Sequence, residues 1–336
     1  MRAAFDFWDR ESGDPTHISW LASAEVRRYI NRSISGDEER GALDWFQRQF
    51  PRRFGRGLSI GCGAGALERD LIRRGICERI DAFDGSLASL SIARREAVDA
   101  GLAKQVHYFV ADFNDPSLPE QTYDIVFVHQ AVHHVTELER LYAAIVSTLR
   151  DGGLLYIDEY VGPSRFDWDE ALIRPHRAVY DGLPERTRAE QKLLLPIQPD
   201  DPSEAVRSSE IIDRLKIGFR ILAQRDYGGN LLSVLFPVVD WSEAQQDLVA
   251  TLIRQERTML AEGAAPYHTV VVAQPVETKA EALLAYARAA RWSRCTRAAK
   301  RVIRAVTHFG RRIEATLRRR AGVALATMRR RPPGVR

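Results

Sequence analysis

Histidine and acidic side chains occur in two short stretches whose chemistry suits the removal of a proton. His129, His133 and His134 stand in one stretch, and Asp158 and Glu159 stand in the other. A histidine accepts a proton from a hydroxyl group or an activated carbon near neutral pH. We expect the general base to be one of His129, His133, His134 and Glu159, and Asp158 and Tyr160 form with Glu159 a second candidate group for the base or for acceptor binding. The alternative for each histidine is a packing role in the turn after a strand.

Two side chains that follow the second stretch are candidates for holding the molecule that loses the proton. Tyr160 stands directly after Glu159, and Arg165 follows five residues later. A guanidinium group suits an anionic or sugar acceptor. An ordinary surface ion pair is the alternative interpretation for Arg165.

A glycine-rich stretch and two later acids together indicate a nucleoside cofactor. Glycines let the backbone approach a ligand closely, and the amides that open the next helix favour an anionic group. Asp84 can accept both hydroxyls of a ribose, Asp112 can accept an exocyclic amine, and Phe113 offers an apolar edge to a purine. Ala66 stands where a nicotinamide-binding turn has its third glycine. The glycine stretch reads Gly61-Cys62-Gly63-Ala64-Gly65.

These residues follow short apolar runs that read as strands separated by helical stretches. Strands that alternate with helical stretches form βαβ units and a parallel sheet, so we expect a doubly wound α/β fold. In such sheets ligands bind at the carboxyl ends of the strands. The expected strands are Leu58–Ile60, Arg79–Phe83, His107–Val110, Tyr123–Val128, Leu154–Tyr160, Phe219–Tyr227 and Tyr267–Ala273, and the turn Asp151-Gly152-Gly153 precedes the fifth.

Composition and charge set the class of protein and its organisation. The 336 residues are 45% hydrophobic and 28% charged, which fits a globular enzyme and excludes a collagen-like or wholly disordered chain. The three cysteines match neither a zinc site nor a disulfide framework, so we expect a reducing compartment. No acidic pair is placed for magnesium and no histidine pattern resembles a zinc site, so we expect no metal. Asp6 and Asp9 interrupt the apolar run that a signal peptide would need. We therefore expect a cytoplasmic protein.

The positive charge is concentrated at the C-terminal end. Residues 279–336 hold 17 Lys and Arg and only two acids, a net charge of +15, which leaves −11 for residues 1–278. Apolar residues between Trp292 and Leu317 recur at spacings of three and four, which predicts a basic amphipathic helix. Such a helix suits an anionic membrane surface, because lipid headgroups and acyl chains engage both of its faces. Nucleic acid and a protein partner are the less favoured alternatives.

With these features the chain resembles the class I S-adenosylmethionine-dependent methyltransferases over roughly residues 40–275. The resemblance implies a Rossmann-like, seven-stranded sheet and S-adenosylmethionine as the cofactor. It places the methionine moiety at Gly61, Cys62, Gly63 and Gly65, the ribose at Asp84, Gly85 and Ser86, the adenine at Asp112 and Phe113, and the methyl group beside His129. The matching stretches are Leu58–Gly65, Asp84–Ser86, Ala111–Phe113, Tyr123–His129, Val132–Val135 and Leu149–Gly153.

One position departs from the pattern of that family. Many members carry an acid two residues before the first glycine, and this chain has Ser59 there. Contact with the amino group of the cofactor must therefore come from backbone carbonyls or from another residue.

A finer resemblance concerns the acceptor. Stretches such as Ser33–Asp37, Glu159–Phe166 and Glu204–Ser208 are similar to bacterial methyltransferases associated with glycan or secondary-metabolite biosynthesis. The resemblance implies O-methylation of a small molecule or of a saccharide, including one carried on a lipid. The alternatives are an RNA methyltransferase anchored by the basic tail, and a non-catalytic protein that binds the cofactor or assembles with partners.

The expected organisation has three parts. Residues 1–50 form a helical N-terminal cap, residues 51–278 form the methyltransferase domain, and residues 279–336 form the basic helical tail. Prolines in residues 181–202 mark a connection or a lid over the acceptor.

Overall fold

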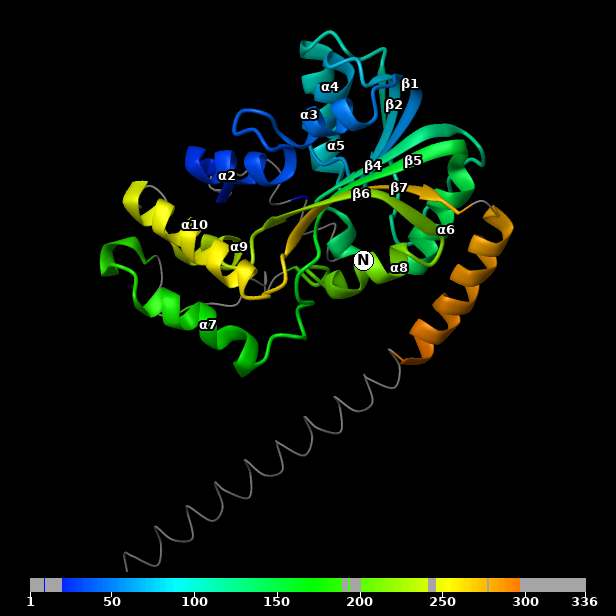
Figure 1. Cartoon of the computed structure of the whole chain (residues 1–336). Coiled ribbons are helices and arrows are strands. Elements are labelled where there is room, and N and C mark those ends of the chain that lie inside the picture. Colours follow the sequence, from blue (N-terminus) through cyan, green and yellow to red (C-terminus); the bar gives the residue numbers. More distant parts are fainter. Residues whose placement is uncertain are drawn as a thin grey trace, which may run out of the picture. The chain divides into compact units, whose positions relative to one another are not determined.

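The computed structural model describes Asp9, residues 20–188, Leu193, and residues 201–240, 246–276 and 278–296. Contacts within the chain divide it into two units, residues 1–286 and 287–336. The first unit contains the whole sheet and both candidate stretches of acids and histidines, and Figure 1 shows its elements.

A seven-stranded sheet forms the centre of the first unit, in the order β3-β2-β1-β4-β5-β7-β6. Strands β1 to β5 are parallel, and β7 runs antiparallel to both β5 and β6. The order reverses at β1 and β4, whose carboxyl ends form the switch point where ligands bind in such sheets. The expected Rossmann-like seven-stranded fold is confirmed. The strands are β1 Phe54–Ile60, β2 Cys77–Asp84, β3 Val106–Val110, β4 Tyr123–His129, β5 Leu149–Tyr160, β6 Phe219–Gly228 and β7 His268–Pro275.

Helices cover both faces of the sheet because strand side chains alternate between two apolar layers. Ile125 and Phe127 of β4 pack with the helices α2 to α5, whereas Val126 and Val128 pack with α6 and α8. The α-helices are α2 Ala24–Ser35, α3 Ala42–Gln49, α4 Ala66–Arg73, α5 Leu87–Asp99, α6 Leu138–Thr148, α7 Glu170–Asp181, α8 Ile211–Leu215, α9 Leu232–Leu235 and α10 Gln246–Ala261. Short 3-10 helices are η1 Trp20–Ala22, η2 Val132–His134, η3 Glu185–Thr187, η4 Ser208–Glu210 and η5 Phe236–Val238.

The strands extend beyond most of the predicted ends, and the fifth shows why. The predicted turn Asp151-Gly152-Gly153 lies inside β5 rather than before it. Tyr123 pairs with Leu149, and Ile125 pairs with Leu154, so β5 takes five steps while β4 takes two. Gly152, with φ of +74°, lies in the extra residues that bulge from the ladder. Glycines that read as a loop in the sequence therefore belong to an irregular strand.

The N-terminal residues that the structure describes are helical, as predicted. Helix α2 begins after Ser23, whose hydroxyl accepts a hydrogen bond from the Val26 amide, and ends at Gly36 in the left-handed conformation. Residues 1–8 and 10–19 of the predicted cap lie outside the described residues. So does most of the predicted lid, from 189 to 192 and from 194 to 200.

The predicted tail begins with a helix over residues 279–296 whose first part belongs to the core of the first unit. The Tyr286 hydroxyl donates to the Leu215 carbonyl and accepts from the Gly218 amide, and both Ala282 and Tyr286 are buried. Residues 297–336, with most of the apolar stripe, lie outside the described residues.

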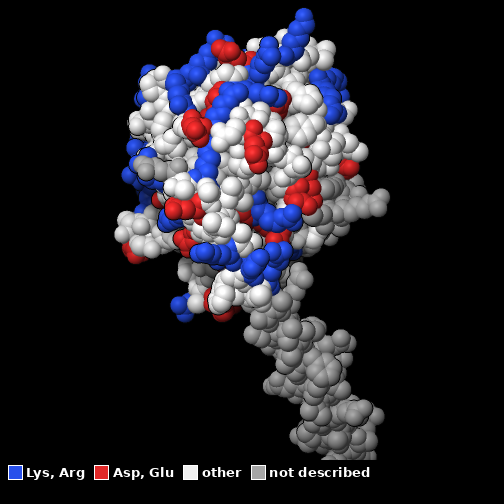
Figure 2. Space-filling view, turned by 90° about the vertical axis from the view of Figure 1, so that its right-hand side faces the viewer, with Lys and Arg blue, Asp and Glu red and all other residues white. Residues whose placement is uncertain are grey.

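On the face shown in Figure 2, basic and acidic side chains are intermixed. No helix among the described residues is long and apolar enough to cross a membrane.

Candidate functional site

The glycine turn follows β1 directly and presses against the loop after β4. Gly61 has φ of +69°, and a Cβ built there would lie 2.5 Å from the Cβ of Ala131. Gly65 has φ of +76°, and its Cβ would overlap with the Tyr108 hydroxyl. Glycine is therefore required at both positions by conformation and by space. The amides of Gly61 and Cys62 donate to the Phe83 carbonyl, which ties this turn to the end of β2.

Asp84 at the end of β2 holds the glycine turn from the other side. Its carboxylate accepts hydrogen bonds from the amides of Gly63, at 2.9 Å, and Ser86, at 2.8 Å. Burial raises the pKa of Asp84, and the nearby Asp9 adds to the rise. Each carboxylate oxygen has two lone pairs, so Asp84 can still accept from a ribose. The ribose contacts expected for Asp84, Gly85 and Ser86 stay predictions.

Asp9 reaches the same edge of the sheet from the N-terminal part of the chain. Its carboxylate accepts from the Ser86 hydroxyl at 2.6 Å and from the Ala88 amide at 3.1 Å. These bonds lower the pKa of Asp9, with the Ser86 bond as the main cause. A carboxylate at the first turn of α5 also fits the positive end of the helix dipole.

The two residues predicted to contact adenine lie in the turn after β3. The Asp112 carboxylate accepts from the Asn114 amide at 2.8 Å, and Phe113 is partly buried against the apolar layer of α6. The side chain of Asn114 in turn accepts from the amides of Thr136 and Glu137, so the turn is fixed to the start of α6. Asp112 and Phe113 are thus at the sheet edge where the sequence predicted them, and their role stays a prediction.

A cavity of about 360 Å³ lies beside the glycine turn and contains a carboxylate that the sequence analysis missed. Glu68 is fully buried, and its Oε1 atom accepts a hydrogen bond from the Ser59 hydroxyl. Its Oε2 atom has no hydrogen-bond partner among the described residues. Burial raises the pKa of Glu68 to about 7. The lining residues are Ser59, Gly61, Cys62, Ala64, Ala66, Leu67, Glu68, Asp70 and His129.

His129 also lines a second cavity, of about 320 Å³. His129 and Asp158 are partners in the parallel ladder of β4 and β5, and 3.8 Å separates His129 Nε2 from Asp158 Oδ2. The Tyr227 hydroxyl donates to Asp158 Oδ1 at 2.7 Å, and burial raises the pKa of Asp158. The lining residues are Trp20, Leu21, Arg27, Ile30, Asn31, Ile34, Ala42, His129, Gln130, Asp158, Tyr227 and His268.

His268 is a buried, neutral side chain in the wall of this second cavity. Burial lowers the pKa of His268 to about 3, and neither ring nitrogen has a hydrogen-bond partner among the described residues. Its ring stacks on Tyr227 and lies against Trp20 and Tyr160. Neither His268 nor Tyr227 was predicted as a site residue, because nothing in their local sequence shows that β6 and β7 bring them beside β5.

Glu159 points away from the second cavity and organises the loop after β4. Its carboxylate accepts from the amides of Ala131, at 2.8 Å, Val132, at 2.6 Å, and Tyr160, at 2.7 Å, and lies 2.5 Å from His133 Nδ1. Burial opposes the charge on both partners, but their mutual attraction prevails: the pKa of Glu159 is lowered and the pKa of His133 is raised to about 9. This buried ion pair holds η2 in place.

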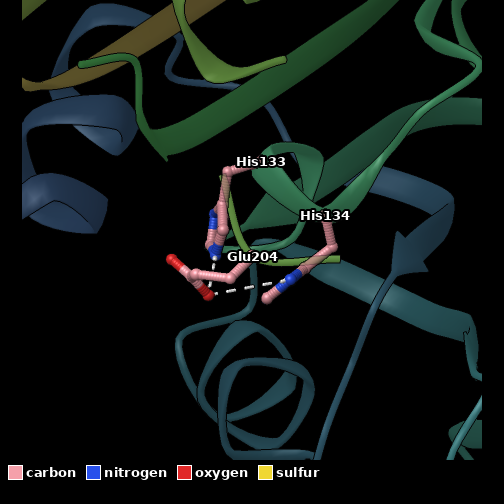
Figure 3. Close-up of side chains that lie close together, drawn as sticks. All are labelled: His133, His134 and Glu204. Atoms are coloured by element: carbon pink, nitrogen blue, oxygen red, sulfur yellow. Dashed lines mark ion pairs between the residues drawn. The ribbon is translucent and has the colours of Figure 1, made fainter. Parts of the chain in front are cut away.

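His133 and His134 meet Glu204, as Figure 3 shows, and line neither cavity. Glu204 Oε2 lies 3.9 Å from His133 Nε2 and 3.9 Å from His134 Nδ1, and Asp201 Oδ2 lies 3.4 Å from His134 Nδ1. The ligand atoms of the two histidines and Glu204 lie within 4.8 Å of one another, so a divalent cation could fit among them. Metal binding at His133 Nε2 would require the ring to lose one proton, and Nδ1–H would still donate to Glu159, as ligating histidines commonly do with a carboxylate.

Arg165, the predicted acceptor-binding arginine, is engaged with the same segment. Its guanidinium donates to the Asp201 carbonyl at 2.8 Å and lies over the ring of Phe166.

Burial lowers the pKa of His134 well below its ordinary value, so His134 is neutral. Of the four predicted catalytic side chains, His129 is the one that borders both cavities.

Comparison with known proteins gives a consistent family. A methyltransferase domain model matches residues 58–157. The chain is 27% identical over 175 residues to a sterol 24-C-methyltransferase of Eremothecium gossypii, covering 52% of this chain and 42% of that protein. It is 32% identical over 116 residues to a ubiquinone biosynthesis O-methyltransferase of Aeromonas salmonicida, covering 34% of this chain and 48% of that protein. The chain thus spans less than half the length of these relatives.

The fold comparison agrees. A geranyl diphosphate C-methyltransferase from Streptomyces coelicolor, solved with Mg²⁺, geranyl diphosphate and S-adenosyl-L-homocysteine, superposes with a TM-score of 0.50. It is 14% identical, and the match covers 82% of this chain and 98% of that one. At this identity the likeness concerns the fold alone. The matching domain over residues 58–157, the strand order and the glycine turn support a class I S-adenosylmethionine-dependent methyltransferase, whose cofactor is S-adenosylmethionine.

Proposed function

We propose that this chain transfers a methyl group from S-adenosylmethionine to a hydroxyl group of a small molecule or saccharide. The observation that carries the proposal is the position of His129 in the wall shared by the two cavities. One cavity adjoins the glycine turn, where the methionine moiety is expected, and the other opens toward α2. An acceptor in the second cavity would have its hydroxyl beside His129.

Methyl transfer requires two things of the protein: it must align the acceptor hydroxyl with the methyl group of the cofactor, and it must remove one proton from that hydroxyl. The cofactor supplies a methyl group on a positively charged sulfur, which is already a good electrophile. His129 would take the proton from the acceptor hydroxyl, and the Asp158 carboxylate would stabilise the positive charge that His129 gains. Tyr227 fixes the orientation of Asp158 through its hydrogen bond. Fixed geometry of this kind lowers the barrier because the reacting groups are already aligned.

The second cavity also suggests the shape of the acceptor. Leu21, Ile30 and Ile34 give it an apolar wall, and His129, Asp158 and Tyr227 give it a polar end. Its volume of about 320 Å³ is at the lower end of ordinary ligand pockets. An acceptor with a hydroxyl group on an apolar or lipid-linked molecule fits a cavity that has an apolar wall and a polar end. The O-methyltransferase named for ubiquinone biosynthesis among the relatives supports an acceptor of this kind.

We also propose that the basic tail brings the enzyme to an anionic membrane on the cytoplasmic side. The support is the net charge of +15 in residues 279–336 and the exposed Trp292 on the described part of the helix. A lipid-linked acceptor would then lie at the same surface.

The experiment uses S-adenosylmethionine labelled with ¹³C in its methyl group and a panel of phenolic, sterol, isoprenoid and sugar acceptors. NMR of the product distinguishes an oxygen-bound methyl group from a carbon-bound one. We expect an O-methyl product, and we expect His129→Gln to lower the rate by about 100-fold or more while the protein still binds S-adenosylhomocysteine. His107→Gln is the control, because His107 is exposed on β3 and lines neither cavity. A C-methyl product, or an unaffected His129→Gln variant, contradicts the proposal.

A further inference from the structure

Glu68 stands where the missing acid of the glycine motif would act. Ser59 occupies the position two residues before the first glycine, and its hydroxyl bonds to Glu68 from the first turn of α4. Both side chains are buried and line the cavity beside the glycine turn. A carboxylate is therefore present at this point of the site, although it comes from the helix and not from the strand.

This carboxylate lacks the partner that a buried charge needs. Oε1 accepts from Ser59, and Oε2 has no hydrogen-bond partner among the described residues. The neighbouring Arg69 directs its guanidinium to the Ala64 carbonyl. None of the ion pairs among the described residues includes Glu68, and the half-exposed His129 acts on it only at longer range. Burying a carboxylate without a cation costs free energy, so the site is one that a cation would stabilise.

A purely structural role for Glu68 accounts for less of the geometry. A structural acid would be expected to use both oxygens, as Glu159 and Glu256 do in this chain: each accepts several backbone amide bonds. Among the described residues, Glu68 accepts no hydrogen bond from the amide of another residue, and its one backbone bond is within its own residue. Asp70, which borders the same cavity, is already paired with Arg74 at 2.7 Å. Glu68 is thus the acid of this cavity that is left for a ligand.

We propose that Glu68 binds the α-ammonium group of the methionine moiety of the cofactor, with Ser59 orienting the carboxylate. The inference rests on the proposed function, because it requires that the methionine moiety occupy this cavity. In this arrangement Ser59 on the strand orients the carboxylate, and Glu68 on the helix binds the ammonium group. The family pattern gives that binding role to an acid on the strand.

The test measures binding of two ligands to the full chain by isothermal titration calorimetry. S-adenosylhomocysteine carries the α-amino acid group, and 5′-methylthioadenosine has the same nucleoside without it. We expect Glu68→Gln to weaken S-adenosylhomocysteine binding by about 10- to 100-fold, as for the loss of one charge-assisted hydrogen bond. Binding of 5′-methylthioadenosine is expected to change by less than about two-fold, within ordinary variation for an unaffected contact. Glu78→Gln, whose exposed side chain pairs with Arg53 and lines neither cavity, should leave both affinities unchanged.

Thermal unfolding without ligand separates a binding role from a structural one. Glu68→Gln keeps the oxygen that accepts from Ser59 and removes an unpaired buried charge, so its melting temperature should equal or exceed that of the wild type. A lower melting temperature overturns the inference, as does an equal loss of affinity for the two ligands or an unchanged affinity for S-adenosylhomocysteine. If the wild-type chain binds neither ligand, the proposed function itself is wrong, and this inference falls with it.

Discussion

Replacing Glu159 by glutamine tests whether this acid is structural or catalytic. Each carboxylate oxygen serves two donors: Oε2 accepts from the amides of Ala131 and Val132, and Oε1 faces His133 and the Tyr160 amide. Whichever oxygen becomes an NH₂ group in the variant, two N–H donors then meet a third donor. The substitution therefore keeps the shape of the side chain and removes half of its acceptors.

The expected loss of stability is about 3–5 kcal/mol, the usual cost of removing one partner from a buried ion pair. That is a large share of the roughly 5–15 kcal/mol that stabilises a typical domain. Thermal and urea unfolding should both report it, with a fall in melting temperature on the order of 10 °C. Glu78→Gln is the matched control, since Glu78 forms an exposed pair with Arg53 and should change stability by less than about 0.5 kcal/mol.

The pH dependence gives a sharper check. Burial alone would lower the pKa of His133, but Glu159 raises it to about 9 from the ordinary 6.5, so its stabilising contribution is complete below pH 6.5 and is lost as the pH rises through 9. The pKa of Glu159 is lowered from 4.5, so its contribution is present above pH 4.5. The difference in stability between wild type and Glu159→Gln should therefore be largest between pH 4.5 and 6.5 and should shrink toward pH 9. A variant as stable as the wild type, or a difference that grows with pH, would refute this reasoning.

Three further predictions concern the cofactor, metals and the tail. Asp84→Asn should weaken binding of both S-adenosylhomocysteine and 5′-methylthioadenosine by about ten-fold or more in calorimetry, because both ligands carry the ribose; loss confined to one ligand contradicts the ribose assignment. Treatment with EDTA should leave the melting temperature and S-adenosylhomocysteine affinity unchanged, because we expect no bound metal and the His133–His134–Glu204 cluster lines neither cavity; a drop in either shows that a metal is bound. The full chain should float with anionic liposomes in moderate salt, and a chain ending at 296 should not; equal flotation of the two contradicts membrane binding through residues 297–336. That truncation keeps the buried Tyr286, which a cut at 278 would remove.

The fold could be predicted because its signals are local. The strand after which the glycine turn begins, the acids that end the next two strands and the alternation of strands with helices all lie within short stretches. The resemblance adds the seven-stranded sheet, which the structure has, whereas the antiparallel direction of β7 was not predicted. Boundaries differed by a few residues, most clearly where Gly152 continues β5 through a bulge.

The contacts of the site could not be predicted as well, because they join distant parts of the chain. The meeting of His134 with Asp201 and Glu204 depends on how a long connection returns to the sheet. The role of Glu68 had one signal that was available: the family acid is absent at Ser59, and Glu68 falls on the same helix face as Leu71 and Ile72, which are apolar and buried. An acid on the apolar face of a helix beside a glycine turn calls for a partner.

The acids at the end of β5 show how strand geometry separates residues that the sequence places together. Successive side chains on a strand point to opposite faces, so Asp158 and Glu159 cannot share one role. Asp158 faces the same side as its ladder partner His129 and borders the second cavity, whereas Glu159 faces the side of α6 and pairs with His133. The sequence therefore grouped the three histidines with Asp158 and Glu159, and the alternation of β5 divides the two acids. His129 with Asp158 is placed to act on an acceptor, and Glu159 with His133 is placed to hold the loop on which His129 depends.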